Sequence, residues 1–334
     1  MTGDMTLSKA GAMDVQREEI SVKGRLVEVP AIRLGERTIV VSGGWLRTAA
    51  VKDEDWLAGD VVSEPEAYIA AIQQGGLKAD LFTFSQKIPH TTPKYRYHRE
   101  WDNVAAVPTS NYENWWEHLV PQETRKNVRR AGRRGVVIRE MAFDTKLLEG
   151  IIEINNETPV RQGRLFWHYG KSLEEVRKDY ETLVDQSRYI GAYFKDELIG
   201  FIKLVTMGEI AGILQLLCKN AHHDKRPANA LIAKAIELCS QNGISYLTYG
   251  QYIYDNKTDS PLTTFKRRNG FVEMRFPRYY VPLTAKGRFA LQTRLHLGIK
   301  RFLPKSIRNM ALNMRSAWYE RKSMSQHTDA TELE

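Results

Sequence analysis

One stretch decides the fold of this chain, at residues 189–254: YIGAYFKDELIGFIKLVTMGEIAGILQLLCKNAHHDKRPANALIAKAIELCSQNGISYLTYGQYIY. Two β-rich runs meet at Lys195 and Asp196, a two-residue connection typical of a hairpin. A nearly continuous apolar run follows, as in a strand covered on both faces. Pro227 then opens a run with helical apolar spacing, which ends at Gly243. The stretch therefore predicts strand, strand, strand, helix and strand: 189–194, 197–207, 210–219, 222–243 and 245–254.

Two further segments extend this pattern. FKRRNGF (265–271) predicts the end of a short basic helix at Gly270, and RYYVPL (278–283) predicts a last strand. The order of elements resembles the core of the GNAT (N-acetyltransferase) superfamily, whose corresponding helix also carries a lysine and is closed by glycine and phenylalanine. Upstream, ETRKNVRRAGRRGVVIRE (123–140) resembles the entry to the second half of the Fem-type aminoacyltransferases and the related Fem-like acetyltransferases.

The resemblance implies two GNAT-like halves fused in one chain. The expected fold class is α/β (α+β), with a mixed sheet flanked by helices. The first half matches weakly, through a meander that turns at Gly35-Glu36, a helix from Pro65 to Gly76, and a helix capped by Ser110 with Glu113. Residues 94–103 are expected to form a loop. The expected division is a tail (1–20), a degenerate first half (21–120), an acyltransferase half (121–283), a basic amphipathic helical extension (284–324) and a second tail (325–334).

The composition is that of a packed globular protein. The 334 residues are 42% hydrophobic and 10% aromatic. Cys218 and Cys239 fall in apolar elements, which favours buried thiols over a disulfide or a metal pair. No run approaches the roughly 18 apolar residues of a membrane span. The N-terminus also lacks the apolar core of a signal peptide. These features predict a cytoplasmic protein.

The formal charge of +9 is uneven along the chain. Arg125, Arg129 and Arg133 form one stripe of a predicted helix, beside a second stripe of basic residues. The helix is either a solvated linker or a surface that contacts phosphate. Residues 286–322 alternate basic and apolar side chains, either packed on the core or in peripheral contact with the inner face of an anionic membrane. Basic surfaces attract phosphates in general, and no specific DNA contact is indicated.

Residues 157–171 combine polar and aromatic side chains with two glycines and have no periodicity. The resemblance places the acceptor wall of the site in this loop; the alternative is an ordered surface loop. His168 has a near-neutral intrinsic pKa and is the candidate general base. The predicted substrate-binding residues are Thr158, Arg161, Gln162, Trp167 and Tyr169.

The resemblance also implies that strands 210–219 and 245–254 splay and admit the pantetheine arm of acyl-CoA (acetyl-CoA). The pyrophosphate then sits at the N-terminus of the following helix, where free N–H groups favour anions. HHDKRPANA (222–230) lacks the glycines of the superfamily's phosphate loop, a trait of the Fem-type branch, whose donor is aminoacyl-tRNA. No metal site is predicted. The predicted cofactor-binding residues are Leu216, Cys218, His222, Lys225, Arg226, Asn229 and Lys266.

Tyr249, Tyr252 and Tyr254 are the further candidates for catalysis, since a strand-end tyrosine can protonate the leaving group. The sequence thus predicts an acyl-CoA-dependent N-acyltransferase. Its acceptor is a small molecule or glycan precursor, for example an amino sugar made for a cell-surface polysaccharide. Two alternatives stay open. One is a Fem-type aminoacyl-tRNA-dependent transferase acting on a cell-wall precursor, and the other is a non-catalytic GNAT-like binding module.

Overall fold

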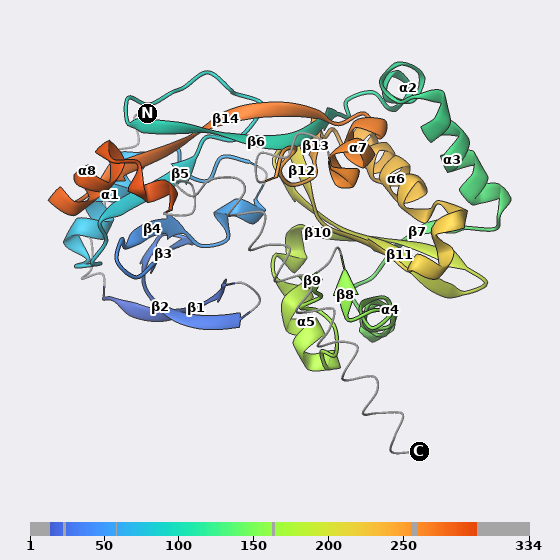
Figure 1. Ribbon diagram of the computed structural model, residues 1–334, viewed down its shortest axis with the longest axis horizontal. Coiled ribbons are helices and arrows are strands. Elements are labelled where there is room, and N and C mark those ends of the chain that lie inside the picture. The colour runs from blue at the N-terminus through green and yellow to red at the C-terminus, as the bar shows by residue number, and fades with distance from the viewer. Residues whose placement is uncertain (1–13, 23–24, 58, 162–163, 255–259, 299–334) are drawn as a thin grey trace, which may run out of the picture. The chain divides into compact units, whose positions relative to one another are not determined.

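The computed structural model describes residues 14–22, 25–57, 59–161, 164–254 and 260–298 (Figure 1). These residues form two compact units. Unit 1 contains the described residues up to 55, with 60–102 and 276–298. Unit 2 contains the described residues of 56–59 and 103–275. The division differs from the sequence-based boundaries at residues 120 and 283, because 103–120 belongs to unit 2 and the end of the last strand to unit 1.

Unit 1 is built on a mixed sheet with strand order β1-β2-β3-β4-β5-β14. The pairs β1–β2, β2–β3 and β3–β4 are antiparallel, β4–β5 is parallel and β5–β14 is antiparallel. The meander turns at Gly35, as predicted, with a positive φ of 58° that glycine adopts without strain. Its elements are β1 (Gln16–Val22), β2 (Arg25–Leu34), β3 (Arg37–Ser42), β4 (Thr48–Val51), η1 (Glu54–Trp56, reaching into unit 2), α1 (Pro65–Gln74), β5 (Leu81–Ser85), α8 (Ala285–Gln292) and η5 (Leu295–Leu297).

Two strands run from one unit into the other: β6 (His98–Pro108) and β14 (Val272–Pro282). Strand β6 corrects the expectation of a loop at 94–103, since the strand begins at His98 and residues 99–102 alternate between exposed and half-buried. A second correction concerns the next helix, whose cap is Asn111 and not Ser110: the Asn111 side chain accepts a hydrogen bond from the backbone N–H of Asn114. Strand β1 likewise begins inside the range expected to be a tail.

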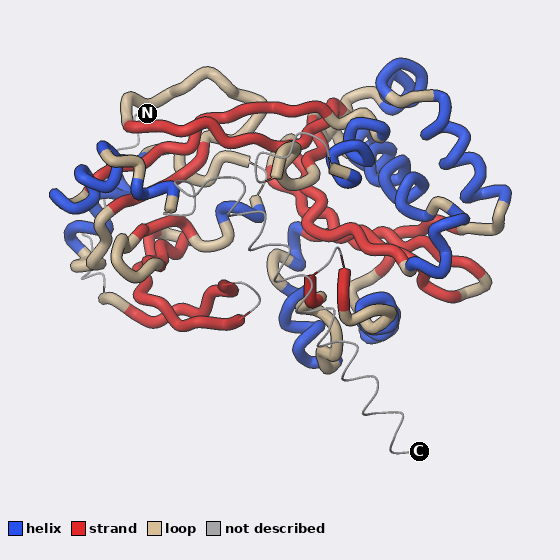
Figure 2. The backbone as a smooth tube through the Cα atoms, in the orientation of Figure 1, coloured by secondary structure: helices blue, strands red, loops and turns tan. Residues whose placement is uncertain are grey.

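Unit 2 contains the sheet β6-β13-β12-β11-β10-β7. Figure 2 shows helices on both faces of it. One core contains apolar side chains of α6, together with Ala131 of α3; the other contains α4 and α5 side chains against β10 and β11. The elements are α2 (Tyr112–Asn114), a π-helical turn η2 (Trp115–Leu119), α3 (Gln122–Arg133), β7 (Val137–Met141), α4 (Thr145–Asn155), β8 (Val160–Arg161), β9 (Arg164–Leu165), α5 (Leu173–Glu181), η3 (Val184–Gln186), β10 (Ser187–Phe194), β11 (Glu197–Met207), β12 (Ile210–Cys218), η4 (Asn220–Lys225), α6 (Pro227–Gln241), β13 (Tyr246–Thr248) and α7 (Pro261–Arg268).

Local sequence explains the ends of these elements. The β10–β11 hairpin turns at Lys195 and Asp196, both at positive φ, as in the primed turns that suit a tight hairpin. Helix α6 has proline in its first turn, where the missing N–H costs nothing. Both cysteines are free and buried, as the sequence predicted.

The predicted C-terminal extension is described only as far as Gly298. Its described part consists of α8 and η5. The rest of 284–324 lies outside the described residues, and so does the expected tail at 325–334. Among the helices that the structure describes, none has both the length and the apolar character needed to cross a bilayer.

Candidate active site

Strands β12 and β13 part after a short parallel ladder. Their register runs from Ile210–Tyr246 to Gly212–Thr248 and stops there, while β12 continues to Cys218. Strand β13 instead follows β6, and the chain beyond it keeps doing so, because Tyr249 N–H donates to the Ala105 carbonyl at 2.9 Å. Among the described residues, the last part of β12 therefore has a strand partner only on its β11 side. Its side chains from Leu214 to Leu217 are partly exposed.

Strand β13 is shorter than the sequence predicts. The sequence indicates a strand over 245–254, and only Tyr246–Thr248 forms one. Gly250 has a φ of +53°, and a Cβ at this position would lie 2.6 Å from the Tyr254 hydroxyl. The backbone thus turns at Gly250, and the Tyr254 hydroxyl packs against this residue. Glycine is required here because only glycine combines that φ with that close approach.

A buried lysine lies among these tyrosines. Lys266 of α7 is fully buried, and its Nζ donates to the Gln251 carbonyl at 2.7 Å. The same Nζ lies 3.4 Å from the Tyr254 hydroxyl and 4.5 Å from the centre of the Tyr249 ring. Burial lowers the pKa of Lys266 to about 7 and raises the pKa of both Tyr249 and Tyr254. Near neutral pH this lysine therefore exchanges a proton easily beside a tyrosine hydroxyl.

Tyr252 is held differently from the other two tyrosines. Its backbone N–H donates to the Asn103 side chain at 2.8 Å, and its carbonyl accepts from the Thr263 hydroxyl at 3.2 Å. Its ring packs partly buried on the α6 side of the sheet. The described contacts of Tyr252 thus fix the loop between β13 and α7.

His168 lies at the open part of β12. The ring is buried, with 5% of the residue exposed, and its Nδ1 lies 3.4 Å from Asp179 Oδ2 on α5. Its Nε2 lies 3.2 Å from the amide nitrogen of Gln215 on β12. An amide nitrogen can only donate, so Nε2 is the unprotonated nitrogen and Nδ1 carries the proton toward Asp179. The lone pair on Nε2 then accepts a hydrogen bond from the Gln215 amide.

Asp179 is held as an anion. Burial raises its pKa, but the nearby His168 ring and a hydrogen bond from Lys171, whose Nζ lies at 2.6 Å, outweigh burial and leave the pKa below its usual value. The α5 N-terminus is fixed by the predicted capping box of Ser172 and Glu175. Asp179 is therefore carried by an anchored helix, while His168 lies in the loop that precedes it.

The loop 157–171 is tied to the end of β12. Arg161 donates to the carbonyls of Ile154 at 2.8 Å and Cys218 at 3.4 Å. Glu157 accepts from the backbone N–H groups of Asn220 and Ala221, at 2.7 and 3.0 Å. Sequence reasoning missed both Glu157 and Asp179, because a carboxylate in a loop and one on a helix gave no local pattern that singled them out.

The other predicted acceptor residues differ in exposure. Trp167 and Tyr169 are 53% and 42% exposed, and the Trp167 ring lies against the His168 ring at 3.7 Å between centroids, tilted by 32°. The Thr158 hydroxyl donates to the Val160 carbonyl and shapes the turn. Gln162 lies outside the described residues.

A pocket of about 560 Å³ opens in unit 2 between the N-terminus of α6 and the length of α7. Arg226 and Arg268 bring positive charge to it, and Asn229 and Ser260 bring polar atoms. Helix N-termini and guanidinium groups both favour anions. Residues of α3 complete the wall: Glu123, Thr124 and Asn127.

The remaining predicted cofactor residues lie elsewhere. The His222 ring lies 3.3 Å from Glu197, and Lys225 pairs with Asp224 and covers the Phe194 ring. Neither lines the pocket. Leu216 is half-buried on β12, and burial raises the pKa of the Cys218 thiol to about 12. The fold thus brings Arg226 and Asn229 to the pocket and Lys266 to the tyrosines.

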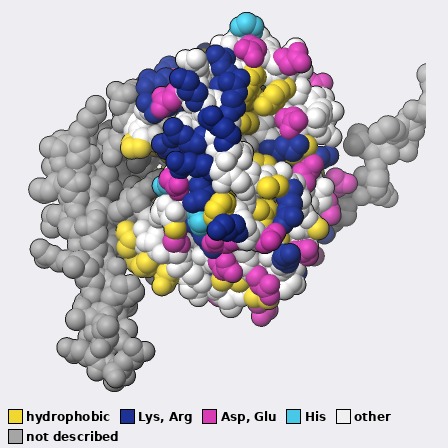
Figure 3. Space-filling view, turned by 90° about the vertical axis from the view of Figure 1, so that its right-hand side faces the viewer, with side chains coloured by type: hydrophobic (Ala, Val, Ile, Leu, Met, Phe, Trp, Pro, Cys, Tyr) yellow, Lys and Arg dark blue, Asp and Glu magenta, His cyan; other side chains and the backbone are white. Residues whose placement is uncertain are grey.

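Helix α3 presents its basic residues to solvent. Lys126, Arg129, Arg130, Arg133 and Arg134 are exposed. Lys and Arg side chains form a dark blue band on the face where α3 lies (Figure 3). Some of the charges are engaged, since Arg134 pairs with Asp224 at 2.6 Å and Arg129 lies over the Trp116 ring. The α3 surface adjoins the pocket through Asn127.

No family model matches the sequence, and the search of curated proteins found no match. Solved structures do match. FemX has a TM-score of 0.56 at 12% identity, over 85% of this chain and 90% of that chain. L-PGS from Bacillus licheniformis has a TM-score of 0.51 at 14% identity, over 78% of this chain and 86% of that chain. The C-terminal domain of a putative lysylphosphatidylglycerol synthetase from Agrobacterium fabrum has a TM-score of 0.50 at 13% identity, over 84% and 89%.

At these identities the likeness concerns the course of the backbone. It agrees with the sequence-based expectation of a mixed sheet flanked by helices in the Fem-like arrangement. The chain therefore has the fold of FemX.

Proposed function

We propose that this protein is an N-acyltransferase that moves an acyl group from acyl-CoA to an amine. One observation carries the proposal: β12 and β13 part, and the His168–Asp179 dyad lies against the edge of β12 that they leave open. An acyl donor lying along that edge takes its hydrogen bonds from backbone groups of β12. The acceptor amine then approaches from the loop 157–171.

The pocket between the α6 N-terminus and α7 supports a donor that carries phosphate. Arg226 and Arg268 supply charge there, and the N-terminus of α6, which has no side-chain cap, contributes Asn229 to the wall. These features replace the glycine-rich loop that the sequence lacks. The pyrophosphate of coenzyme A is the anion assigned to this pocket.

The chemistry needs one base and one acid. The amine attacks the thioester carbonyl and forms a C–N bond, and its proton passes to Nε2 of His168, whose imidazolium form Asp179 stabilises. The C–S bond breaks, and the leaving thiolate takes a proton from Tyr254, beside which Lys266 lies at 3.4 Å. Lys266, with its pKa near 7, then returns a proton to the tyrosine.

The exposed rings of Trp167 and Tyr169 favour an acceptor with an apolar or sugar face. An amino sugar of a cell-surface polysaccharide or cell-wall precursor has both such a face and an amine. Precursors of this class are made in the cytoplasm or at the inner face of the membrane, and we propose that the protein acts at one of these two locations.

The test combines binding with product analysis. Calorimetric titration of the full chain with acetyl-CoA should give one site per chain. Mass spectrometry after incubation with glucosamine derivatives should show a mass gain of one acetyl group. The absence of both binding heat and product, with acetyl-CoA and with longer acyl-CoA, would contradict a coenzyme A donor.

A second donor is favoured by a separate observation, the exposed basic surface of α3 beside the pocket. A polyanion such as aminoacyl-tRNA suits a surface of this length, and two structures of similar fold are named FemX and lysylphosphatidylglycerol synthetase. Transfer of a radiolabelled amino acid from charged tRNA to a lipid or peptide precursor would establish this donor. A chain that binds neither donor would instead be the non-catalytic module.

A further inference from the structure

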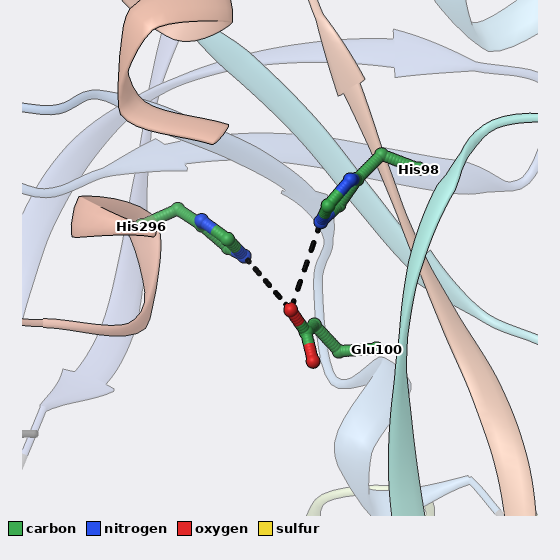
Figure 4. Close-up of side chains that lie close together, drawn as sticks. All are labelled: His98, Glu100 and His296. Atoms are coloured by element: carbon green, nitrogen blue, oxygen red, sulfur yellow. Dashed lines mark ion pairs between the residues drawn. The ribbon is translucent and has the colours of Figure 1, made fainter. Parts of the chain in front are cut away.

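Three side chains in unit 1 converge outside the proposed acyl-transfer site. His98 and Glu100 stand two residues apart on β6, so their side chains leave the same face of the strand. His296 comes from η5, after α8. Figure 4 shows the three side chains pointing toward one another. Nε2 of His98 and Nε2 of His296 lie 3.7 and 3.9 Å from Oε1 of Glu100, and the three atoms all lie within 4.8 Å of one another.

The His296 ring is held in a fixed orientation. Its side chain is fully buried and packs against the Tyr280 ring at 4.8 Å between centroids. Its Nδ1 lies 3.3 Å from the carbonyl of Ala290. A carbonyl only accepts, so Nδ1 carries the proton and Nε2 directs a lone pair toward Glu100. A backbone carbonyl behind one ring nitrogen is the usual support for a histidine whose other nitrogen binds a metal.

We propose that His98, Glu100 and His296 bind one Zn²⁺ ion. Zinc bonds to nitrogen and to carboxylate oxygen are about 2.0–2.2 Å long, which sets tetrahedral donor atoms roughly 3.3–3.5 Å apart. The two distances to Glu100 Oε1, 3.7 and 3.9 Å, exceed this by a few tenths of an ångström, which small side-chain rotations would remove. Two imidazoles and one carboxylate favour zinc over magnesium or calcium, which prefer all-oxygen sites.

The ion keeps a fourth position open to water. The His98 and Glu100 side chains are 37% and 27% exposed, so solvent reaches the ligand atoms from their side. His296 lies on the buried side. Three protein ligands and a solvent position are the arrangement that lowers the pKa of a zinc-bound water.

This site departs from the expectation that the chain has no metal site. The sequence offered no ligand spacing, because the two histidines come from distant parts of the chain and only the fold brings them together. The competing explanation is an ion pair of a protonated histidine with Glu100. A proton and a zinc ion compete for the same lone pairs, so the two explanations differ in what the full chain binds near pH 7.5.

The full chain, freed of metal by a chelator, is titrated with ZnCl₂ in a calorimeter at pH 7.5. We expect one ion per chain. Glu100→Gln and His98→Ala should each weaken binding by at least about 100-fold, the upper end for loss of even an outer-shell partner. His118→Ala removes an exposed histidine of unit 2 and should leave the affinity unchanged.

Cobalt provides an independent measurement. Co²⁺ bound at this site should give visible absorption bands of tetrahedral intensity in the wild-type chain and none in Glu100→Gln. Circular dichroism of each variant checks the fold, and Glu100→Gln keeps the size of the side chain. No stoichiometric zinc binding by the wild-type chain, or equal affinity in both ligand variants and wild type, would overturn the proposal and leave the ion pair as the account of this cluster.

Discussion

His168 derives its chemistry from its neighbours. Asp179 holds the proton on Nδ1, and Gln215 approaches Nε2 from the strand along which the donor is proposed to lie. The Trp167 ring, whose centroid lies 3.7 Å from that of His168, limits rotation of the imidazole.

His168→Gln should lower kcat by about 10²–10⁴-fold, the range for loss of a general base. Glutamine keeps a polar side chain of similar length, so binding of the donor should change little. The exposed His223→Gln is the control and should retain wild-type kcat. Steady-state kinetics with acetyl-CoA measures both; a His168→Gln enzyme within twofold of wild type would remove His168 from catalysis.

Lys266 should make stability depend on pH. Its pKa in the fold is about 7, while in the unfolded chain it returns to its ordinary value of 10.5. Between these values the unfolded chain binds more protons, so the free energy of unfolding should rise with pH, by up to about 1.4 kcal/mol per pH unit. Below pH 7 both states are protonated and the dependence disappears.

The measurement is urea unfolding of wild type and Lys266→Met from pH 6 to pH 9. Other titrating groups cancel in the difference between the two chains. We expect the wild type to gain stability relative to the variant from pH 7 upward. A difference that stays constant over that range would show that Lys266 keeps an ordinary pKa.

At the scale of elements, the end of β13 decides whether a site exists. The ladder with β12 stops at Thr248, and the turn at Gly250 then carries the chain toward Tyr254 and α7. A longer strand paired to β12 would close the edge on which the proposed donor depends. The sequence indicated parting strands only through the resemblance, since apolar composition alone predicted one strand over 245–254.

Gly250→Ala tests this turn. Alanine at positive φ costs about 1–2 kcal/mol, and here its Cβ would also lie 2.6 Å from the Tyr254 hydroxyl. We expect a lower kcat together with the loss of stability, because Tyr254 must move away from Lys266. The matched control is Gly243→Ala, at a φ of +70° with no described atom within 4 Å of the added Cβ.

The control variant shares the backbone strain and leaves Tyr254 undisturbed. The thermal stability should therefore fall in both variants, and kcat only in Gly250→Ala. Equal kcat in the two variants would show that the position of Tyr254 does not affect turnover.

Local patterns predicted most elements of unit 2, because its helices and strands have clear periods and caps. The Ser172–Glu175 capping box and the turn at Lys195-Asp196 are confirmed to the residue. Failures came where neighbours far away in sequence decide the outcome. The sequence predicts a loop where β6 begins, and Asp179 and Glu157 have their roles only through His168 and through the backbone after β12.

For the whole molecule, charge is the property that separates the two proposed donors. The net charge of +9 includes the exposed side chains of α3, which border the pocket without forming its base. Coenzyme A is short, so its phosphates should interact mainly with the charges that line the pocket. A tRNA is long and should sense the whole of α3, with a strong dependence on salt.

Two sets of variants therefore distinguish the donors. Arg226→Ala with Arg268→Ala removes the cations of the pocket, and should weaken acetyl-CoA binding at least tenfold, since a hydrogen bond to a charged group contributes about 1.5–3 kcal/mol. Lys126→Ala, Arg130→Ala and Arg133→Ala together remove exposed charge from α3 and should leave acetyl-CoA affinity within twofold.

If tRNA is the carrier, the triple variant of α3 should bind RNA more weakly than the wild-type chain does. The slope of log K against log salt should also become shallower, by about 0.7–0.9 for each phosphate that the variant no longer neutralises. Calorimetry measures acetyl-CoA binding, and filter binding from 50 to 200 mM salt measures RNA binding. If the α3 variant fails to bind acetyl-CoA while the pocket variant still binds it, the phosphate does not lie in the pocket.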